Sequence, residues 1–298
     1  MISRIILLLA LSSPAWALVK VVTTTPDLAW AARRVGGDKV EVVSLLNGTE
    51  DPHHVDTVPS FIVKVADADV VCVVGLELEI GWIPKVLSRS GNSKVQPGGP
   101  GYCETGKAVS VLEKPEGNID RSMGDVHPGG NPHFWLSPKG LSEAASEIRD
   151  TLVRVDPASK EAYQKNYSAL SKELSEILKA GQTKLKALKR PIMEYHKEFS
   201  YFIHAYRLKS LGSLEEKPGV PPSAGRIAKV SIDAKNSKAA ILLAGKYAPE
   251  KVLNRFQEAS GVPVLVVSTS LEPDSGLKEY ADFQNRLIDG ILKKSSGN

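Results

Sequence analysis

The sequence predicts an α/β protein in which two parallel-sheet lobes are joined by one long rigid helix. Short β-branched runs alternate with amphipathic segments both before residue 90 and after residue 190. Such alternation is typical of parallel strands whose sheet is covered by helices. Between the two parts lies a long stretch, 158–188, that contains almost no helix breakers. We therefore expect a first lobe over residues 18–157, a linking helix over 158–189 and a second lobe over 190–298.

The first lobe is predicted from three apolar runs and the segments between them. Runs of valine, isoleucine and leucine indicate strands at 19–24, 40–45 and 70–74. Helices are expected at 28–35, 59–68 and 82–88, and Gly36 and Gly37 should end the first of them. Residues 91–131 are dense in Gly, Pro and Asn, which predicts mainly loop with one short strand at 108–112.

The linking helix is predicted from apolar residues that recur at helical spacing, after a shorter helix at 141–153. The apolar positions are Tyr163, Tyr167, Leu170, Leu174, Ile177 and Leu178. At 1.5 Å per residue this helix would be about 45 Å long. Gly181 lies inside it and costs about 1 kcal/mol relative to alanine, which is too little to end the helix.

Alternation resumes after Pro191 and predicts the second lobe. Strands are expected at 192–195, 208–214, 239–243 and 262–267. Helices are expected at 199–206, 223–236, 249–260 and 280–293. Ser223 is a suitable N-cap for the second of these helices.

Composition and the N-terminal residues predict an exported globular protein. The chain of 298 residues is 42% hydrophobic and carries a net charge of +4, and its Lys and Arg residues are scattered, which disfavours nucleic-acid binding. Residues 1–17 have a basic start, a short apolar run and the sequence Ala15-Trp16-Ala17, as in a cleaved signal peptide. Because no cysteine follows Ala17, we expect a periplasmic protein without a lipid anchor.

Two cysteines leave the redox state open. An exported protein can carry a disulfide between Cys72 and Cys103. However, Cys72 lies in the apolar run 70–74, where a buried free thiol is an equally good interpretation. Neither cysteine has the CxxC spacing of a zinc knuckle.

Three of the six histidines are predicted to lie where strands end. His53, His133 and His196 lie in loops that follow, or directly at the end of, predicted strands, which is where α/β sheets place ligands. Neutral imidazole binds zinc, and zinc favours four ligands in a tetrahedron. Proline precedes His53 and His133 and restricts the backbone there. The alternative for each residue alone is a surface or hydrogen-bonded histidine.

Four stretches together resemble the metal receptors of ABC-type zinc and manganese importers, the cluster A-I solute-binding proteins. They are Asp51-Pro52-His53, residues 130–138 (GNPHFWLSP), residues 195–202 (YHKEFSYF) and Pro222-Ser223-Ala224. The resemblance implies a metal cleft between the lobes, with His53, His133 and His196 as the first three ligands. It also implies a monomer that delivers its metal ion to an ABC importer permease in the inner membrane.

The fourth ligand is not fixed by the resemblance. The family usually has an acid in the loop after a late strand of the second lobe, but here that loop reads STSLEPDS over 268–275. Glu272 and Asp274 are candidates, and so is a water molecule. His127 lies in a loop between glycines and is a further candidate. Ser137 stands where the family's second motif often has aspartate.

The donor set favours zinc as the transported ion. Imidazole suits zinc, whereas manganese prefers more oxygen ligands; copper and nickel also bind imidazole. A manganese-specific receptor is the nearest alternative, followed by a metal-dependent adhesin or chaperone. An enzyme is not expected, because the chain has neither the HExxH motif of a zinc hydrolase nor the GxSxG motif of a serine esterase.

Overall fold

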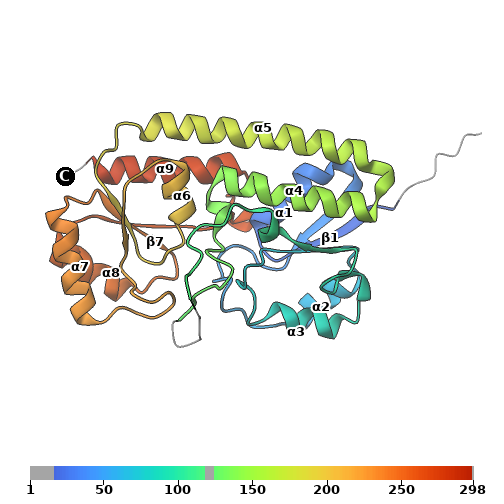
Figure 1. Ribbon diagram of the computed structural model, residues 1–298, viewed down its shortest axis with the longest axis horizontal. Helices are drawn as coiled ribbons and strands as arrows, with labels where there is room; N and C mark the ends of the chain where they lie inside the picture. The colour runs from blue at the N-terminus through green and yellow to red at the C-terminus, as the bar shows by residue number, and fades with distance from the viewer. Residues whose placement is uncertain (1–16, 118–123, 297–298) are drawn as a thin grey trace, which may run out of the picture.

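Two four-stranded parallel sheets form the centres of two lobes. The computed structural model describes residues 17–117 and 124–296, so the predicted signal peptide lies outside the described residues except for Ala17. One lobe contains sheet order β2-β1-β3-β4 and the other β6-β5-β7-β8. Figure 1 shows the two lobes side by side with helix α5 running along both. The predicted fold class, two parallel-sheet lobes and one long helix, is confirmed.

The first sheet is covered by helices on both faces. Its strands are β1 (Val19–Thr23), β2 (Val40–Ser44), β3 (Val70–Val73) and β4 (Tyr102–Glu104). Its helices are α1 (Pro26–Gly36), α2 (Pro59–Ala66), α3 (Ile83–Ser90) and α4 (Pro138–Val155). Helix α1 begins with Pro26 after the N-cap Thr25 and ends at the left-handed Gly37, whose φ is 59°.

The strand predicted at 108–112 is wrong. The fourth strand of this sheet is β4, and residues 105–108 form a short 3-10 helix instead. Strand β4 is only three residues long and pairs in register with β3, so that Cys103 lies beside Cys72. A three-residue strand is too short to show a periodic pattern, and tertiary packing therefore decides its position.

The two cysteines are neighbours in the core of the first lobe. Both are fully buried and both are free thiols. Burial raises the pKa of Cys72 well above its usual value. Of the two interpretations that the sequence left open, the structure has the buried free thiol.

The second lobe has the same parallel architecture. Its strands are β5 (Ile192–Glu194), β6 (Ser210–Ser213), β7 (Ile241–Gly245) and β8 (Val264–Val267). Its helices are α6 (Ser200–Ala205), α7 (Ala224–Asn236), α8 (Glu250–Ser260) and α9 (Tyr280–Ser295). Every residue of the central strand β7 is buried, as expected for a parallel strand that is covered on both faces.

Helix α5 (Lys160–Leu185) is the long helix that the sequence predicts. It packs against α1 and α4 of the first lobe and against α9 of the second. At Gly181 a Cβ atom would overlap the side chains of Tyr206 and Ile288, so glycine is what lets the second lobe approach the helix closely. Among residues 17–117 and 124–296, no helix combines the length and apolar character needed to cross a bilayer.

One hydrophobic cluster runs through both lobes. It includes Leu28 of α1, Leu141 of α4, Leu170 of α5, Ile192 of β5 and Leu287 of α9. Two smaller clusters lie under α2 and α3 and under α7 and α8. A shared core fixes the relative position of the lobes, and the loops at the carboxyl ends of β2 and β5 then meet between them.

Candidate metal centre

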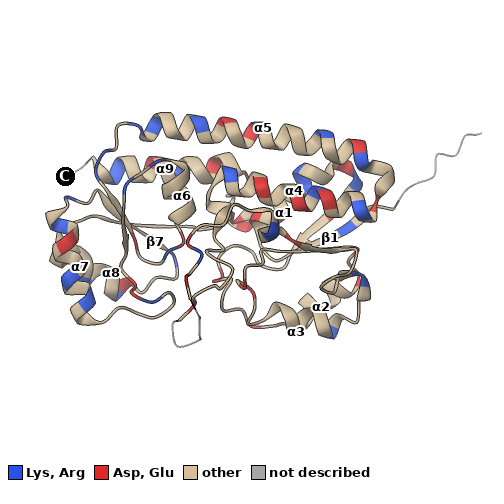
Figure 2. Cartoon of the chain, in the orientation of Figure 1, with Lys and Arg blue, Asp and Glu red and all other residues tan. Residues whose placement is uncertain are grey.

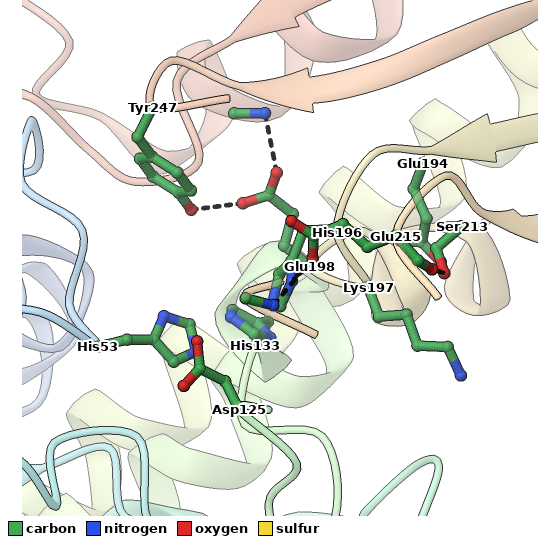
Figure 3. A network of polar contacts seen from close by, with 12 residues as sticks. His53, Asp125, His133, Glu194, His196, Lys197, Glu198, Ser213, Glu215 and Tyr247 are labelled. Atoms are coloured by element: carbon green, nitrogen blue, oxygen red, sulfur yellow. Dashed lines mark hydrogen bonds and ion pairs between the residues drawn. The ribbon is translucent and has the colours of Figure 1, made fainter. Parts of the chain in front are cut away.

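Three histidines that are distant in the sequence converge between the lobes. His53 lies in the loop after β2, His133 directly precedes the short helix Phe134–Leu136, and His196 follows β5. One ring nitrogen from each lies within 4.8 Å of one from each of the other two. The ring centroids are 5.1 to 5.6 Å apart. Figure 3 shows the three rings together at the centre of a polar network.

Each of these rings is oriented by an oxygen on its Nδ1 side. The partners are Asp51 Oδ1 at 2.8 Å from His53, Asn131 Oδ1 at 2.9 Å from His133 and Glu215 Oε2 at 2.9 Å from His196. An acceptor at Nδ1 places the ring proton there and leaves the Nε2 lone pair available. This is the usual arrangement of histidines that bind metal.

His53 and His133 are oriented by the same local hydrogen-bond motif. Asp51 and Asn131 each stand two residues before a histidine, with proline between. Each also accepts a hydrogen bond from the histidine backbone nitrogen, at 3.0 Å for His53 and 2.9 Å for His133. The side chain of the first residue therefore fixes both the backbone and the ring of the third. The sequences DPH and NPH thus specify the orientation of these two histidine rings locally.

His133 carries an unsatisfied buried nitrogen. Its side chain is only 2% exposed, and its Nε2 has no hydrogen-bond partner among the described residues. Burial, followed by the nearby His53 and His196, lowers its pKa well below the usual value. Leaving a buried polar atom unpaired costs about 1–3 kcal/mol. A metal ion bound to this nitrogen would remove that cost.

The pKa of His196 is shifted in the opposite direction to that of His133. Burial lowers its pKa, but the hydrogen bond to Glu215 and the charges of Glu198 and Glu215 outweigh burial and raise it overall. Glu215 is itself fixed by the backbone nitrogen of Gly219, which donates to Oε2 at 2.9 Å. His196 is thus more readily protonated than His133.

His127 adjoins the cluster from the loop that follows residue 123. Its Nε2 is 3.3 Å from Nε2 of His53, and the two ring centroids are 5.3 Å apart. The ring also hydrogen-bonds the backbone of Leu76. Burial, followed by the charges of His53 and His196, lowers the pKa of His127 to about 3. The ring is therefore neutral at physiological pH.

The two acidic candidates lie outside the three-histidine group. Both carboxylate oxygens of Glu272 accept from Nζ of Lys246, at 2.5 and 2.7 Å. Asp274 is exposed in the short helix Pro273–Ser275. Ser137 is the N-cap of α4 and accepts from the backbone nitrogen of Gly140 at 3.3 Å. Serine and aspartate are both good N-caps, which explains why either can occupy this position.

Glu198 and Tyr247 form a buried contact that no sequence motif predicted. Glu198 is fully buried and accepts hydrogen bonds from the backbone nitrogen of Gly245, at 2.8 Å, and from the hydroxyl of Tyr247. Burial raises the pKa of Glu198 to about 7. The spacing His196-Lys197-Glu198 was a visible signal for the acid. Nothing in the sequence connected it with Tyr247, which comes from the loop after β7.

The site also ties the lobes together. Asn131, which orients His133, donates from Nδ2 to the carbonyl oxygen of Lys197 at 2.6 Å. The hydroxyl of Tyr201 donates to the carbonyl oxygen of Asn131 at 2.8 Å. Asn131 of the first lobe, which orients His133, is thus bonded to two residues of the second. A change in lobe position would therefore change the geometry around His133.

Several characterised proteins are similar in sequence. The zinc-binding lipoprotein AdcA of Streptococcus pneumoniae is 27% identical over 253 residues, which are 84% of this chain but only 50% of the relative. The chain thus spans about half the length of that relative. The high-affinity zinc uptake protein ZnuA of Bacillus subtilis is 26% identical over 91% of this chain and 86% of the relative. The manganese ABC transporter substrate-binding lipoprotein PsaA of S. pneumoniae is 27% identical over 92% of this chain and 89% of the relative.

Solved structures share the fold. A deletion mutant of ZnuA with zinc bound superposes with a TM-score of 0.78 at 20% identity, over 95% of this chain and all of that one. A manganese-bound periplasmic metal-binding protein of Candidatus Liberibacter asiaticus superposes with a TM-score of 0.75 at 18% identity, over 93% of this chain and 99% of that one.

The family profile settles the classification. The profile described as "Zinc-uptake complex component A periplasmic" matches residues 21–294, which is nearly all of the part of the chain that the structure describes. The match contains the three converging histidines and both lobes. The chain therefore belongs to the ZnuA family of zinc-uptake complex component A proteins.

Proposed function

We propose that this protein is an extracytoplasmic receptor that captures one zinc ion between its lobes and delivers it to the permease of an ABC importer. It is a binding protein, not an enzyme. The observation that carries the proposal is the convergence of His53, His133 and His196 with Nδ1 of each ring occupied by an acceptor. Three imidazole nitrogens held in this way form a preorganised site for a divalent transition metal.

One distance favours His127 as the fourth ligand, although His127 lies outside the group of three histidines whose nitrogens are all within 4.8 Å of one another. Four nitrogens in a tetrahedron at 2.0–2.1 Å from zinc are about 3.3–3.4 Å from one another. Nε2 of His127 lies 3.3 Å from Nε2 of His53, which matches this edge. Glu272 is paired with Lys246 and Asp274 is exposed, so neither competes with His127 in this arrangement. Water is the alternative fourth ligand.

Carboxylates behind the histidines balance the charge of the ion. Asp51 and Glu215 contact the rings of His53 and His196, and Glu198 is buried two residues beyond His196. Figure 2 shows acidic segments in the loops between the lobes. A divalent cation bound by four neutral imidazoles would be costly to bury without such partners.

Manganese is the second candidate because one relative, PsaA, is named for manganese. Manganese prefers oxygen ligands over imidazole, and the group that converges here offers nitrogen. Zinc therefore remains the better fit to this donor set.

We also propose the finer points of location and organisation. Residues 1–17 act as a cleaved signal peptide, and the mature protein is a periplasmic monomer without a lipid anchor or nucleic-acid partner. Residues 18–157 and 190–298 form the two lobes, and 158–189 the connection. Because α5 packs on both lobes, metal uptake and release involve a small tilt and local loop movement rather than a wide hinge.

The test is metal analysis and calorimetry on purified apo-protein. We expect one zinc ion per chain, and a loss of affinity of at least about tenfold for each of His53→Ala, His133→Ala and His196→Ala. His127→Ala should weaken zinc binding less than these three changes, because a water molecule can take the place of His127 as fourth ligand. His204→Ala is the matched control, since His204 is exposed on α6 and outside the cluster. Unchanged affinity in all three ligand variants would refute the proposal.

A further inference from the structure

The loop after β7 holds a buried carboxylate beside the histidine cluster. Glu198 follows His196 by two residues and is fully buried. Its Oε1 accepts from the backbone nitrogen of Gly245 at 2.8 Å, and its Oε2 accepts from the hydroxyl of Tyr247. Figure 3 shows the carboxylate next to His196, joined to Tyr247 by one of these bonds. Both carboxylate oxygens are therefore engaged at the carboxyl end of β7, one by its last residue and one by the loop that follows.

The arrangement depends on particular residues at the carboxyl end of β7 and in the loop after it. A Cβ atom at position 245 would come within 2.9 Å of Oε1 of Glu198, so glycine gives the carboxylate access to the backbone. The hydroxyl of Tyr247 also lies 3.2 Å from Oγ1 of Thr269, which fixes the ring from the other side. Lys246, between these two residues, pairs with Glu272 in the same way. Residues 245–247, at the end of β7 and directly after it, thus hold two acids of the second lobe.

A carboxylate in this position would alter the choice of metal if it were free. Oxygen ligands favour manganese, which takes more of them, whereas an all-imidazole shell favours zinc. Given the proposed metal-binding function, we infer that Tyr247 is a specificity-determining residue. By holding Oε2 of Glu198, Tyr247 keeps this carboxylate out of the coordination shell and so maintains the preference for zinc over manganese.

The hydroxyl is the decisive part of Tyr247. Without it, Oε2 would be a buried charged atom with no protein partner that the structure records, and a buried charged acceptor left unpaired is unfavourable. A cation bound at the neighbouring histidines would then be a group able to satisfy it. Gly245 cannot prevent this, because its nitrogen engages only Oε1.

The experiment compares zinc and manganese affinities, measured by competition with a chelator, in the parent protein and in Tyr247→Phe. We expect the zinc-to-manganese affinity ratio to fall by about tenfold in the variant, the value of one hydrogen bond to a charged group. Cobalt bound to the variant should show a weaker visible absorption, as its coordination number rises. Combining Tyr247→Phe with Glu198→Gln should restore the parent ratio, because a neutral amide is a poor ligand.

Tyr206→Phe is the matched control, since it removes another buried tyrosine hydroxyl, bonded to Gln284 at 2.8 Å, away from the cluster. Its ratio should equal that of the parent. Tyr247→Met also removes the hydroxyl and serves as a second variant if Tyr247→Phe does not fold. An unchanged ratio in the Tyr247 variant, or a lowered ratio that persists with Glu198→Gln, overturns the inference. A parent protein that binds neither ion overturns the proposed function instead.

Discussion

At the scale of single residues, the site depends on which atoms are already occupied. Asp51, Asn131 and Glu215 take the Nδ1 side of three rings and so decide that Nε2 faces the centre. The least exposed of these rings, His133, leaves its Nε2 unpaired. The oxygens thus prepare the rings for a cation before any cation binds, and their removal should affect affinity without removing a ligand.

Glu215→Gln tests this preparation. The amide can still contact His196 but no longer provides a charge, so we expect zinc affinity to fall by about 10–100-fold while the fold is retained. Calorimetric titration of zinc measures the change. Glu216→Gln, at the neighbouring exposed position, should leave affinity unchanged. Equal effects of the two substitutions would show that Glu215 does not act through His196.

The pH dependence of zinc affinity follows from the different shifts of the rings. Zinc requires neutral imidazole. The pKa values of His127 and His133 are lowered, so these rings are already neutral, whereas the pKa of His196 is raised above 6.5. Affinity should therefore fall as pH decreases through the raised pKa of His196. Zinc titrations between pH 5.5 and 8.5 measure this dependence, and an affinity that stays constant over this range would contradict the assignment to His196.

At the scale of elements, α5 can pack against both lobes because one narrow face of the helix is buried along its length while the other faces are polar and exposed. Leu170, Leu174 and Gly181 lie on the buried side. Glycine has a low helix propensity, so its presence in the middle of a helix requires a packing reason. The close approach of Tyr206 and Ile288 supplies that reason.

The variant Gly181→Ala shows whether side-chain packing or helix propensity has the larger effect on stability at this position. Helix propensity alone predicts that alanine stabilises α5 by about 1 kcal/mol. Because a Cβ atom would overlap Tyr206 and Ile288, we expect the protein to be destabilised instead, by about 1–3 kcal/mol. Denaturant unfolding of the two proteins decides the sign. A more stable variant would mean that the helix and the second lobe can separate without cost.

At the scale of the whole molecule, a buried acid fastens the lobes near the cleft. Asp27 at the start of α1 accepts from the hydroxyl of Ser270 and, at 3.2 Å, from the backbone nitrogen of Leu271. Both partners belong to the loop that follows β8 in the second lobe. Asp27 is completely buried, and burial raises its pKa to about 7. The contact therefore links lobe packing to pH.

The consequence is a stability that declines as pH rises. The native state holds the proton of Asp27 up to about pH 7, whereas the unfolded chain loses it near 3.8, so the stability gained from this proton is fully present below 3.8 and is lost as pH rises through 7. In Asp27→Asn this part of the pH dependence should disappear, and the variant should gain relative to the parent between pH 4.5 and 8. The free energies of unfolding of both proteins, measured at pH 4.5 and at pH 8, test this expectation. Parallel stability profiles for the two proteins would exclude Asp27 as the cause.

The sequence by itself determined the elements and the local ligand motifs. Apolar periodicity depends only on neighbouring residues, so it predicted both lobes and α5. The motifs around His53 and His133 orient their rings through residues two positions away, and they too could be identified from the sequence. Strand β4 was misplaced because three residues carry no period.

Only the tertiary structure decided which distant groups meet. Glu215 reaches His196 from 19 residues away and Tyr247 reaches Glu198 from 49, while His127 approaches His53 across 74. No local pattern encodes such pairs, because they arise when the packing of two sheets and one helix brings separate loops to the same place. The three histidines were therefore predictable as candidates, but the orientation of His196 by Glu215, the approach of His127 to His53 and the contact between Glu198 and Tyr247 were not.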